Sequence, residues 1–147
     1  MSEAADAQIV VLDTDVWSAI YIRRDVPESV RRWRDLLVGR TVVISTQTRA
    51  EVLSGIAAGN WGDRRRDQAR RVLDDQATVP VTSDVIGAFA NLFAECRRAG
   101  HPLHEKIHTG DRWVAATAVA LGAPLLAGDR IYRGTPGLTL LGEPEDS

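Results

Sequence analysis

The sequence predicts an α/β protein with a central, mostly parallel sheet. Short β-branched runs alternate with segments whose apolar residues recur at helical spacing, and the first run is apolar at every position. A strand of that kind is typical of a sheet covered on both faces. The chain has 147 residues, the length of one domain. We therefore expect one domain over 1–147, with polar tails at 1–7 and 143–147.

The first half of the chain contains two predicted strands and three predicted helices. In order, these are strand 9–12, helix 16–22, helix 28–38, strand 41–44 and helix 46–59. Asp15 is expected to cap the first helix, and Gly39 to stop the second. Ser45 or Thr46 should begin the third, which places Glu51 on a helix shortly after a strand.

The second half continues the alternation. The predicted elements are a polar helix from about 64 to 76, strand 78–81, a helix from 83 to about 99, helix 111–121, strand 123–127 and an edge strand at 138–141. Ser83 and Asp84 are the expected cap of the second of these helices, and Gly100 its end. The segment 101–110 is the longest irregular stretch, and Asp111 should begin the helix that follows it.

Composition is that of an ordinary soluble globular protein, with 44% hydrophobic and 26% charged residues. No apolar stretch approaches the roughly 20 residues that span a bilayer. Residues 1–8 lack the basic and apolar segments of a secretory signal. A lone Cys96 permits no internal disulfide and suits a reducing compartment. We expect a cytoplasmic protein that does not bind a membrane.

Arginine supplies nearly all of the positive charge, and most of the arginines lie in five short clusters. The clusters are 23–24, 31–34, 64–66, 70–71 and 97–98. Guanidinium groups bind phosphate bidentately and stack on unpaired bases, so these clusters would suit a nucleic-acid strand. Each cluster taken alone is better explained as a solvated helix face with nearby acids, so the arginines are supporting evidence only.

Four acidic residues stand where predicted elements begin, end or turn inward: Asp13, Glu51, Asp111 and Asp129. Because adjacent parallel strands gather their carboxyl ends at one edge of the sheet, these side chains are expected to share a cleft. Carboxylates packed closely repel one another unless a hard cation lies between them, and oxygen ligands favour Mg²⁺ or Mn²⁺. The implied reaction is hydrolysis of a phosphate ester.

Each of these acids also has a purely structural explanation. Asp13 could cap a helix together with Asp15, and Asp111 could be a cap of its own helix. Asp129 could be a turn residue, and Glu51 an exposed helical acid. Asp13 differs from the others because it directly follows four apolar residues and should be partly enclosed, where an ionised carboxylate needs a partner.

The motifs around the four acids resemble a known family, the PIN-domain ribonucleases, and most closely the VapC toxins of bacterial toxin-antitoxin pairs. The matching segments follow one another in order: VLDTDVWS at 11–18, TRAEVL at 48–53, DRWVAATA at 111–118 and LLAGD at 125–129. The resemblance spans nearly the whole chain. It implies a three-layer α/β/α sandwich.

The resemblance also implies a function. Asp13, Glu51, Asp111 and Asp129 match the family's acidic quartet, which binds Mg²⁺ or Mn²⁺ and activates water to cut single-stranded or looped RNA. We hypothesise that Asp13, Asp111 and Asp129 hold one or two ions, directly or through water, while Glu51 positions the attacking water. The resemblance further implies a homodimer and a cognate VapB-type antitoxin that blocks the cleft.

Two positions depart from the family pattern. Position 15 is often Asn and is Asp here, which could make Asp15 a water-mediated metal group, with the role of helix cap equally open. Position 127 is commonly Thr or Ser and is Ala here, so a hydroxyl that would orient Asp129 or its water is missing.

Other conspicuous residues receive structural interpretations. The three histidines, His101, His104 and His108, all lie in the irregular segment. Their spacing is not that of a structural zinc site. We expect a mobile surface loop here in preference to a contact with RNA. Trp113 is expected to pack on the sheet. Burial or a dimer contact is expected for the remaining three tryptophans, at positions 17, 33 and 61, in preference to base stacking.

Two other function classes remain open from the residues alone. Asp13-Thr14-Asp15 after a strand also resembles the nucleophile motif of haloacid-dehalogenase phosphatases, although Trp17 and the loop position of Lys106, the only lysine, fit that family poorly. That class would form an aspartyl-phosphate at Asp13. Alternatively, the fold is a non-catalytic domain that binds RNA or a protein, and the acids are structural.

Overall fold

A computed structural model describes residues 8–142, and the two predicted polar tails lie outside this range. The strands are β1 (Ile9–Leu12), β2 (Thr41–Ser45), β3 (Thr78–Val79) and β4 (Leu125–Leu126). The α-helices are α2 (Thr14–Tyr21), α3 (Ser29–Leu37), α4 (Thr46–Ala58), α5 (Asp63–Asp74), α6 (Ser83–Ala99) and α7 (Thr109–Leu121). Three short 3₁₀ helices are η1 (Pro102–His104), η2 (Lys106–His108) and η3 (Arg130–Tyr132).

The four strands form one parallel sheet in the order β3-β2-β1-β4. Strand β1 is central, with Val10 paired to Val42 of β2 and Leu12 paired to Leu126 of β4. Val10 and Leu12 pack into the apolar cluster on one face of the sheet, while Val11 packs into the cluster on the other. The all-apolar run therefore has the two-sided burial that the sequence predicted.

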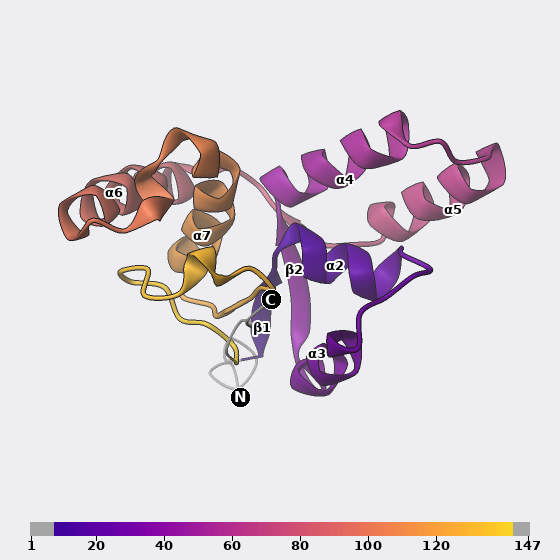
Figure 1. The fold of residues 1–147 in the computed structure, drawn as a ribbon, viewed down its shortest axis with the longest axis horizontal. Helices are drawn as coiled ribbons and strands as arrows, with labels where there is room; N and C mark the ends of the chain where they lie inside the picture. The colour runs from indigo at the N-terminus through magenta and orange to yellow at the C-terminus, as the bar shows by residue number, and fades with distance from the viewer. Residues whose placement is uncertain (1–7, 143–147) are drawn as a thin grey trace.

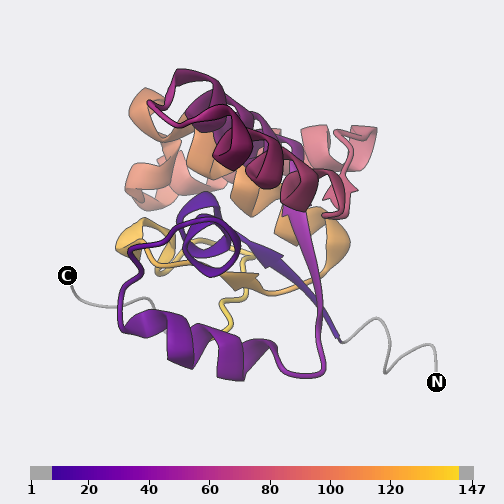
Figure 2. The same cartoon turned by 90° about the vertical axis from the view of Figure 1, so that its right-hand side faces the viewer.

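Helices cover both faces of the sheet (Figures 1 and 2). Apolar residues of α2, α3, α4 and α5 belong to one core cluster, and those of α6 and α7 belong to the other. The α/β class and the three-layer sandwich are thus confirmed. Figure 1 shows the helices α4 and α5 on one side of the sheet and α6 and α7 on the other, with β1 and β2 between them.

Most helix ends agree with the sequence, but two caps do not. Asp13, and not Asp15, caps α2, because the Asp13 side chain accepts a hydrogen bond from the backbone of Val16. Thr82, and not Ser83 with Asp84, caps α6 in the same way. The residue that caps a helix is the last one with an extended backbone before the first helical turn. Sequence composition alone does not identify which residue that is.

The segment 101–110 is more ordered than expected. It folds into η1 and η2, and α7 begins at Thr109, so Asp111 lies in the first turn and does not begin the helix. Buried Arg112 donates hydrogen bonds to the carbonyl oxygens of Leu103 at 2.7 Å and Glu105 at 3.3 Å. An interior arginine on α7 therefore fastens the irregular segment to the fold.

The prediction of an edge strand at 138–141 is wrong, since this part of the chain contributes only an isolated bridge between Leu140 and Leu125. Trp17 and Trp33 are buried as expected, whereas Trp61 is only half-buried. Among the described helices, none combines the length and the apolar character needed to cross a membrane.

Candidate active site

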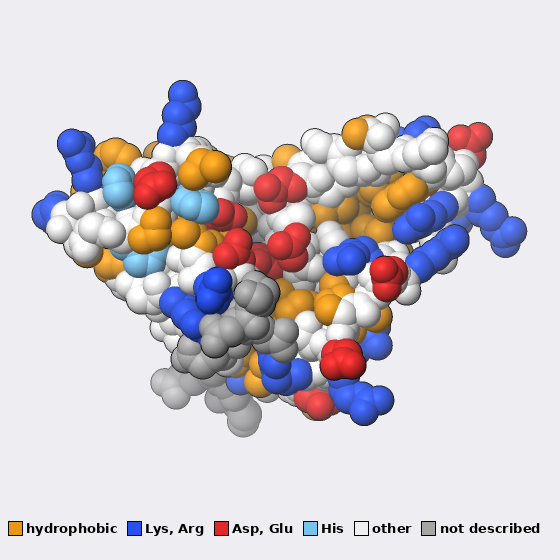
Figure 3. Space-filling view, viewed as in Figure 1, with side chains coloured by type: hydrophobic (Ala, Val, Ile, Leu, Met, Phe, Trp, Pro, Cys, Tyr) orange, Lys and Arg blue, Asp and Glu red, His pale blue; other side chains and the backbone are white. Residues whose placement is uncertain are grey.

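The predicted acidic residues lie around the carboxyl ends of β1 and β4. Asp13 follows β1 directly, and Asp129 follows β4 after two further residues. Glu51 comes from α4 and Asp111 from α7. Figure 3 shows acidic side chains grouped in a hollow between the two helical sides of the molecule. The fold thus places the acids of four distant segments on one face.

Asp13 is the most enclosed of these acids, with 5% of its surface exposed. Its Oδ1 accepts a hydrogen bond from the backbone N–H of Val16 at 2.9 Å, and the backbone of Gly128 donates a second. Burial nevertheless dominates and raises the pKa of Asp13 to about 7, with the charges of Asp15 and Asp111 adding to the increase. Without a cation, the negative charge on Asp13 is therefore costly.

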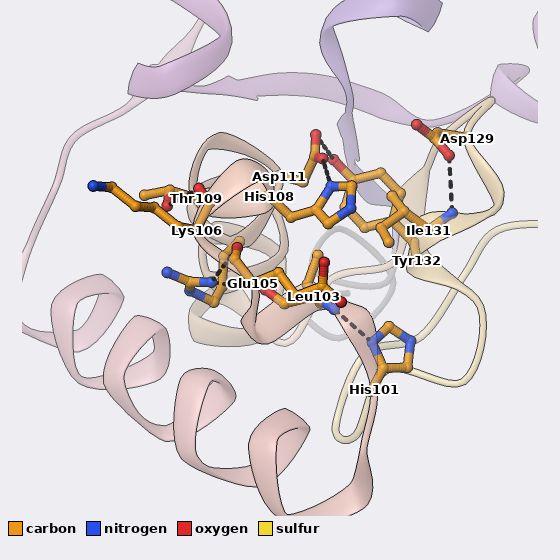
Figure 4. A network of polar contacts seen from close by, with 11 residues as sticks. His101, Leu103, Glu105, Lys106, His108, Thr109, Asp111, Asp129, Ile131 and Tyr132 are labelled. Carbon is orange, nitrogen blue, oxygen red and sulfur yellow. Dashed lines mark hydrogen bonds and ion pairs between the residues drawn. The ribbon is translucent and has the colours of Figure 1, made fainter.

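Asp111 is held at both carboxylate oxygens (Figure 4). Nδ1 of His108 lies 3.0 Å from Oδ2, and the hydroxyl of Tyr132 donates to Oδ1 at 3.3 Å. Because two neighbours bind two different oxygens, they fix the rotation of the carboxylate as well as its position. The side chain of Asp111 remains 37% exposed, so it is still accessible from the hollow.

Tyr132 occupies the centre of the acidic group and was not predicted from the sequence. Its side chain is almost fully buried, and the charges of Asp13, Asp111 and Asp129 all act on its hydroxyl. Burial first, and these carboxylates second, raise the pKa of Tyr132 far above its ordinary value. The hydroxyl is therefore a permanent hydrogen-bond donor. No local motif indicates this role, since Tyr132 lies on η3, which follows β4 in the chain and packs against η1.

Glu51 lies at the edge of the site, exposed on α4 and beside the first turn of α7. The hydroxyl of Thr14 donates to Oε1 of Glu51 and lies 3.1 Å from the hydroxyl of Thr48. Oε2 points toward Gly110, where a Cβ added to the glycine would lie 3.6 Å from it and 2.9 Å from Nε2 of Gln47. Glu51 thus has one anchored oxygen and one that faces the helix bearing Asp111.

The remaining two acids are more peripheral. Asp129 is exposed, and its Oδ1 accepts from the backbone N–H of Ile131 at 2.9 Å, so it has the turn-forming contact that was the structural alternative for it. Asp15 is exposed on the first turn of α2 and acts on Asp13 through its charge. Ala127 is buried and brings no hydroxyl to the site.

One of the three histidines contacts an acid of the site, and the other two bind backbone groups near it. His108 contacts Asp111, which the assignment to a mobile surface loop did not anticipate. His101 instead caps η1, accepting from the backbone N–H of Leu103, and its Nε2 lies 2.7 Å from the carbonyl oxygen of Arg133. His104 binds the carbonyl oxygen of His101.

The acidic group fits a divalent cation in charge and in donor type. All of its acids offer oxygen, the ligand of Mg²⁺ and Mn²⁺, and a positive charge beside Asp13 would offset the repulsion that raises its pKa. Within residues 8–142, no three Asp, Glu, His or Cys side chains converge closely enough to hold a metal ion in their present positions. The carboxylates surround a common region without meeting at one point.

Comparison with known proteins identifies the family of this fold. The model of the PIN domain family matches residues 10–138. The VapC ribonuclease Y4jK of Sinorhizobium fredii is 30% identical over 139 residues, which cover 90% of this chain and 96% of that protein.

Two solved structures show the same fold. VapBC2 from Rickettsia felis, bound to a DNA fragment from its promoter, superposes with a TM-score of 0.73 at 22% identity, covering 94% of this chain and 99% of that one. VapBC-5 of Mycobacterium tuberculosis, a member of the VapBC family of toxin-antitoxin systems, has a TM-score of 0.64 at 24% identity, covering 90% and 97%. This chain belongs to the PIN-domain family, among its VapC-type members.

Proposed function

We propose that this protein is a divalent-metal-dependent endoribonuclease and the toxin of a VapBC-type toxin-antitoxin pair. The observation that carries the proposal is the enclosed carboxyl of Asp13, whose pKa is raised to about 7 and which faces the charges of Asp15 and Asp111. Such an arrangement is stabilised when a cation is present. Membership of the PIN family and the relative named a VapC ribonuclease support nuclease chemistry over the phosphatase hypothesis.

In this proposal, Asp13, Asp111 and Asp129 hold one or two Mg²⁺ or Mn²⁺ ions, directly or through water, and Asp15 contributes through water. When bound, such an ion supplies positive charge beside the phosphodiester, where negative charge develops during hydrolysis. Because the three carboxylates do not meet at one point, water would supply part of the coordination of such an ion, as is usual for Mg²⁺.

The protein's own groups then orient and activate the reactants. His108 and Tyr132 fix both oxygens of Asp111, so its carboxylate needs little reorganisation on binding. Thr14 anchors one oxygen of Glu51. The other oxygen of Glu51 positions the attacking water and accepts its proton. Glu51 is suited to this role because it is exposed at the edge of the hollow, where water reaches it.

The proposed partners follow from the family assignment. The structural neighbours include a member of the VapBC family of toxin-antitoxin systems, which supports a cognate VapB-type antitoxin for this chain. An arginine of that antitoxin would neutralise the acidic group as a metal ion does, and would thereby block the hollow. We also propose a homodimer, as the resemblance implies.

The direct test is incubation of purified, antitoxin-free protein with total cellular RNA in Mg²⁺ or Mn²⁺. We expect discrete fragments that are absent in EDTA and absent from the Asp13→Asn and Asp111→Asn variants. Asp84→Asn, which removes an exposed acid of α6 far along the chain from these segments, serves as the matched control and should cleave normally. Intact RNA together with no measurable Mn²⁺ binding would instead favour a non-catalytic RNA- or protein-binding domain.

A further inference from the structure

A basic basin lies on the α2 and α5 side of the molecule. It has a volume of about 560 Å³, within the range of ligand pockets, and is lined by Arg24, Arg64, Arg65, Trp61 and Gln68 among others. No carboxylate is among its lining residues. A second cavity of about 160 Å³ shares Arg24, Arg65 and Gln68 with it. The basin therefore offers guanidinium and amide groups and no acid.

One arginine of the basin is held in position by an aromatic ring. The guanidinium of Arg65 lies 4.0 Å from the ring centroid of Trp61. Trp61 itself packs against the core cluster beneath α2 and α4. The neighbouring Arg66 donates to the carbonyl oxygen of Gly59 at 2.9 Å, which ties α5 to the loop before it. Arg65 thus presents its planar donors with little rotational freedom to lose on binding.

The basin's arginines are also not neutralised by acids. In the described part of the chain, Arg24, Arg64 and Arg65 make no ion pair, whereas Arg49 of α4 lies 3.1 Å from Asp74. Arg24 and Arg64 are exposed. Three unneutralised positive charges at one basin attract a polyanion, and planar guanidinium groups fit phosphate bidentately.

The basin and the acidic group stand at opposite ends of one short helix. Asp13 caps the start of α2, and Arg24 follows its end by three residues. Eight helical residues span about 12 Å. Figure 3 shows basic side chains gathered over the α5 side of the same face that carries the central acids. At roughly 3.4 Å per stacked nucleotide, about four nucleotides would reach from one to the other.

We propose that this basin binds the sugar-phosphate backbone of single-stranded RNA on one side of the bond that is cut at the acidic group. This inference rests on the proposed nuclease function, and adds to it a second contact with the substrate. An extended acidic peptide fits less well, because it would meet the repulsive carboxylates of the hollow without the phosphodiester that draws RNA to a metal ion there.

The test measures RNA binding separately from cleavage. Fluorescence anisotropy of a short, labelled single-stranded RNA is followed in EDTA for the wild type, Arg24→Gln, Arg65→Gln and the double variant, over a range of salt concentrations. Arg98→Gln removes an exposed arginine from the end of α6 and is the control for the loss of one positive charge. Arg65→Lys keeps the charge while losing the planar fork. Circular dichroism establishes that each variant is folded.

We expect the double variant to bind RNA about tenfold more weakly and to lose about 0.7 from the salt slope for each arginine removed. Arg98→Gln should change affinity less than about twofold, and Arg65→Lys should weaken binding without changing the salt slope. Unchanged affinity and slope in the double variant would overturn the proposal. A second result would also overturn it: polyglutamate binds the wild type as tightly as RNA does, and the same substitutions abolish that binding. The basin would then recognise an acidic peptide.

Cleavage assays distinguish this inference from the nuclease proposal itself. If the wild type cuts RNA and the double variant cuts it with an unchanged KM, the nuclease function stands and the basin is not a substrate contact. If no RNA is cut, no Mn²⁺ binding is measurable and the binding losses still appear as expected, the basin is an RNA site and the nuclease proposal fails. For a cleaved RNA, the effect of Arg24→Gln on KM should vanish once fewer than about four nucleotides remain on the basin side of the cut.

Discussion

At the scale of single residues, the site depends on neighbours that carry no charge at neutral pH. Tyr132 is the clearest case, since it donates to Asp111 from a buried position among three carboxylates. A hydroxyl in this place satisfies part of the negative charge on Asp111 and fixes the direction of its lone pairs. Residues that bind a metal ligand in this way are often nearly as important for metal affinity as the ligand itself.

Tyr132→Phe is therefore expected to weaken Mn²⁺ binding by about tenfold while leaving the protein folded. The phenyl ring keeps the buried contacts, and Asp111 remains partly exposed, so the free energy of unfolding should fall by only about 1 kcal/mol. Calorimetric titration of Mn²⁺ well below the melting temperature separates the two effects. Tyr21→Phe, at the only other tyrosine of the chain, is the control and should bind Mn²⁺ normally. Equal Mn²⁺ affinity of Tyr132→Phe and wild type would show that Tyr132 only packs.

Residues also show where sequence-based prediction of the site ends. Asp13 was predicted to be enclosed because it directly follows four apolar residues, and this is confirmed. Tyr132 and Thr14 were missed, since each acts on an acid that is distant in the sequence: Asp111 and Glu51. A side chain's long-range partner follows from how elements pack, and one sequence without coordinates does not give that packing.

At the scale of elements, the start of α7 joins the two sides of the hollow. Gly110 lies in its first turn, against Gln47 and Glu51 of α4, and any side chain there would approach Nε2 of Gln47 to 2.9 Å. The helix was predicted to begin at Asp111, so this contact was not foreseen. The other helices were predicted to within a few residues at each end, because apolar spacing fixes the middle of a helix while local hydrogen bonds decide its ends.

Gly110→Ala should therefore impair function without unfolding the protein. Alanine favours the helix by roughly 0.5–1 kcal/mol, and the flexible end of Gln47 can move aside, so stability should change by less than about 1 kcal/mol. The displaced Gln47 amide would crowd Glu51, and we expect kcat for RNA cleavage to fall severalfold with little change in KM. Gly87→Ala on α6, where a Cβ meets nothing within 4 Å, is the matched substitution. Identical loss of activity in both variants would point to a general helix effect.

At the scale of the whole molecule, the acidic hollow links stability to pH and to metal. The folded protein raises the pKa of Asp13 from 3.8 to about 7, so it binds the proton more tightly than the unfolded chain does. The stability associated with this proton is fully present below about pH 4 and is lost as pH rises through about 7. Binding of a divalent cation to the ionised carboxylate reverses that loss, since the cation takes the place of the proton.

In EDTA, we expect Asp13→Asn to be more stable than the wild type at about pH 8, by about 2–4 kcal/mol, and to lose this advantage toward about pH 4. Asparagine is as good a helix cap as aspartate and removes only the charge, so the cap on α2 is retained. Urea unfolding at several pH values measures the difference. Parallel pH profiles for the two proteins would mean that Asp13 is not destabilised by its surroundings.

Metal should then remove most of the stability difference between the two proteins. At about pH 8, Mn²⁺ at a hundred times its dissociation constant is expected to stabilise the wild type by about 2.7 kcal/mol and to leave Asp13→Asn nearly unchanged. Below about pH 5 the stabilisation of the wild type should largely disappear, because protons then compete for Asp13. Asp84→Asn controls for the loss of a surface charge and should respond to Mn²⁺ as the wild type does. Equal stabilisation of Asp13→Asn by Mn²⁺ would place the cation away from β1 and would leave the buried charge of Asp13 without the function proposed for it.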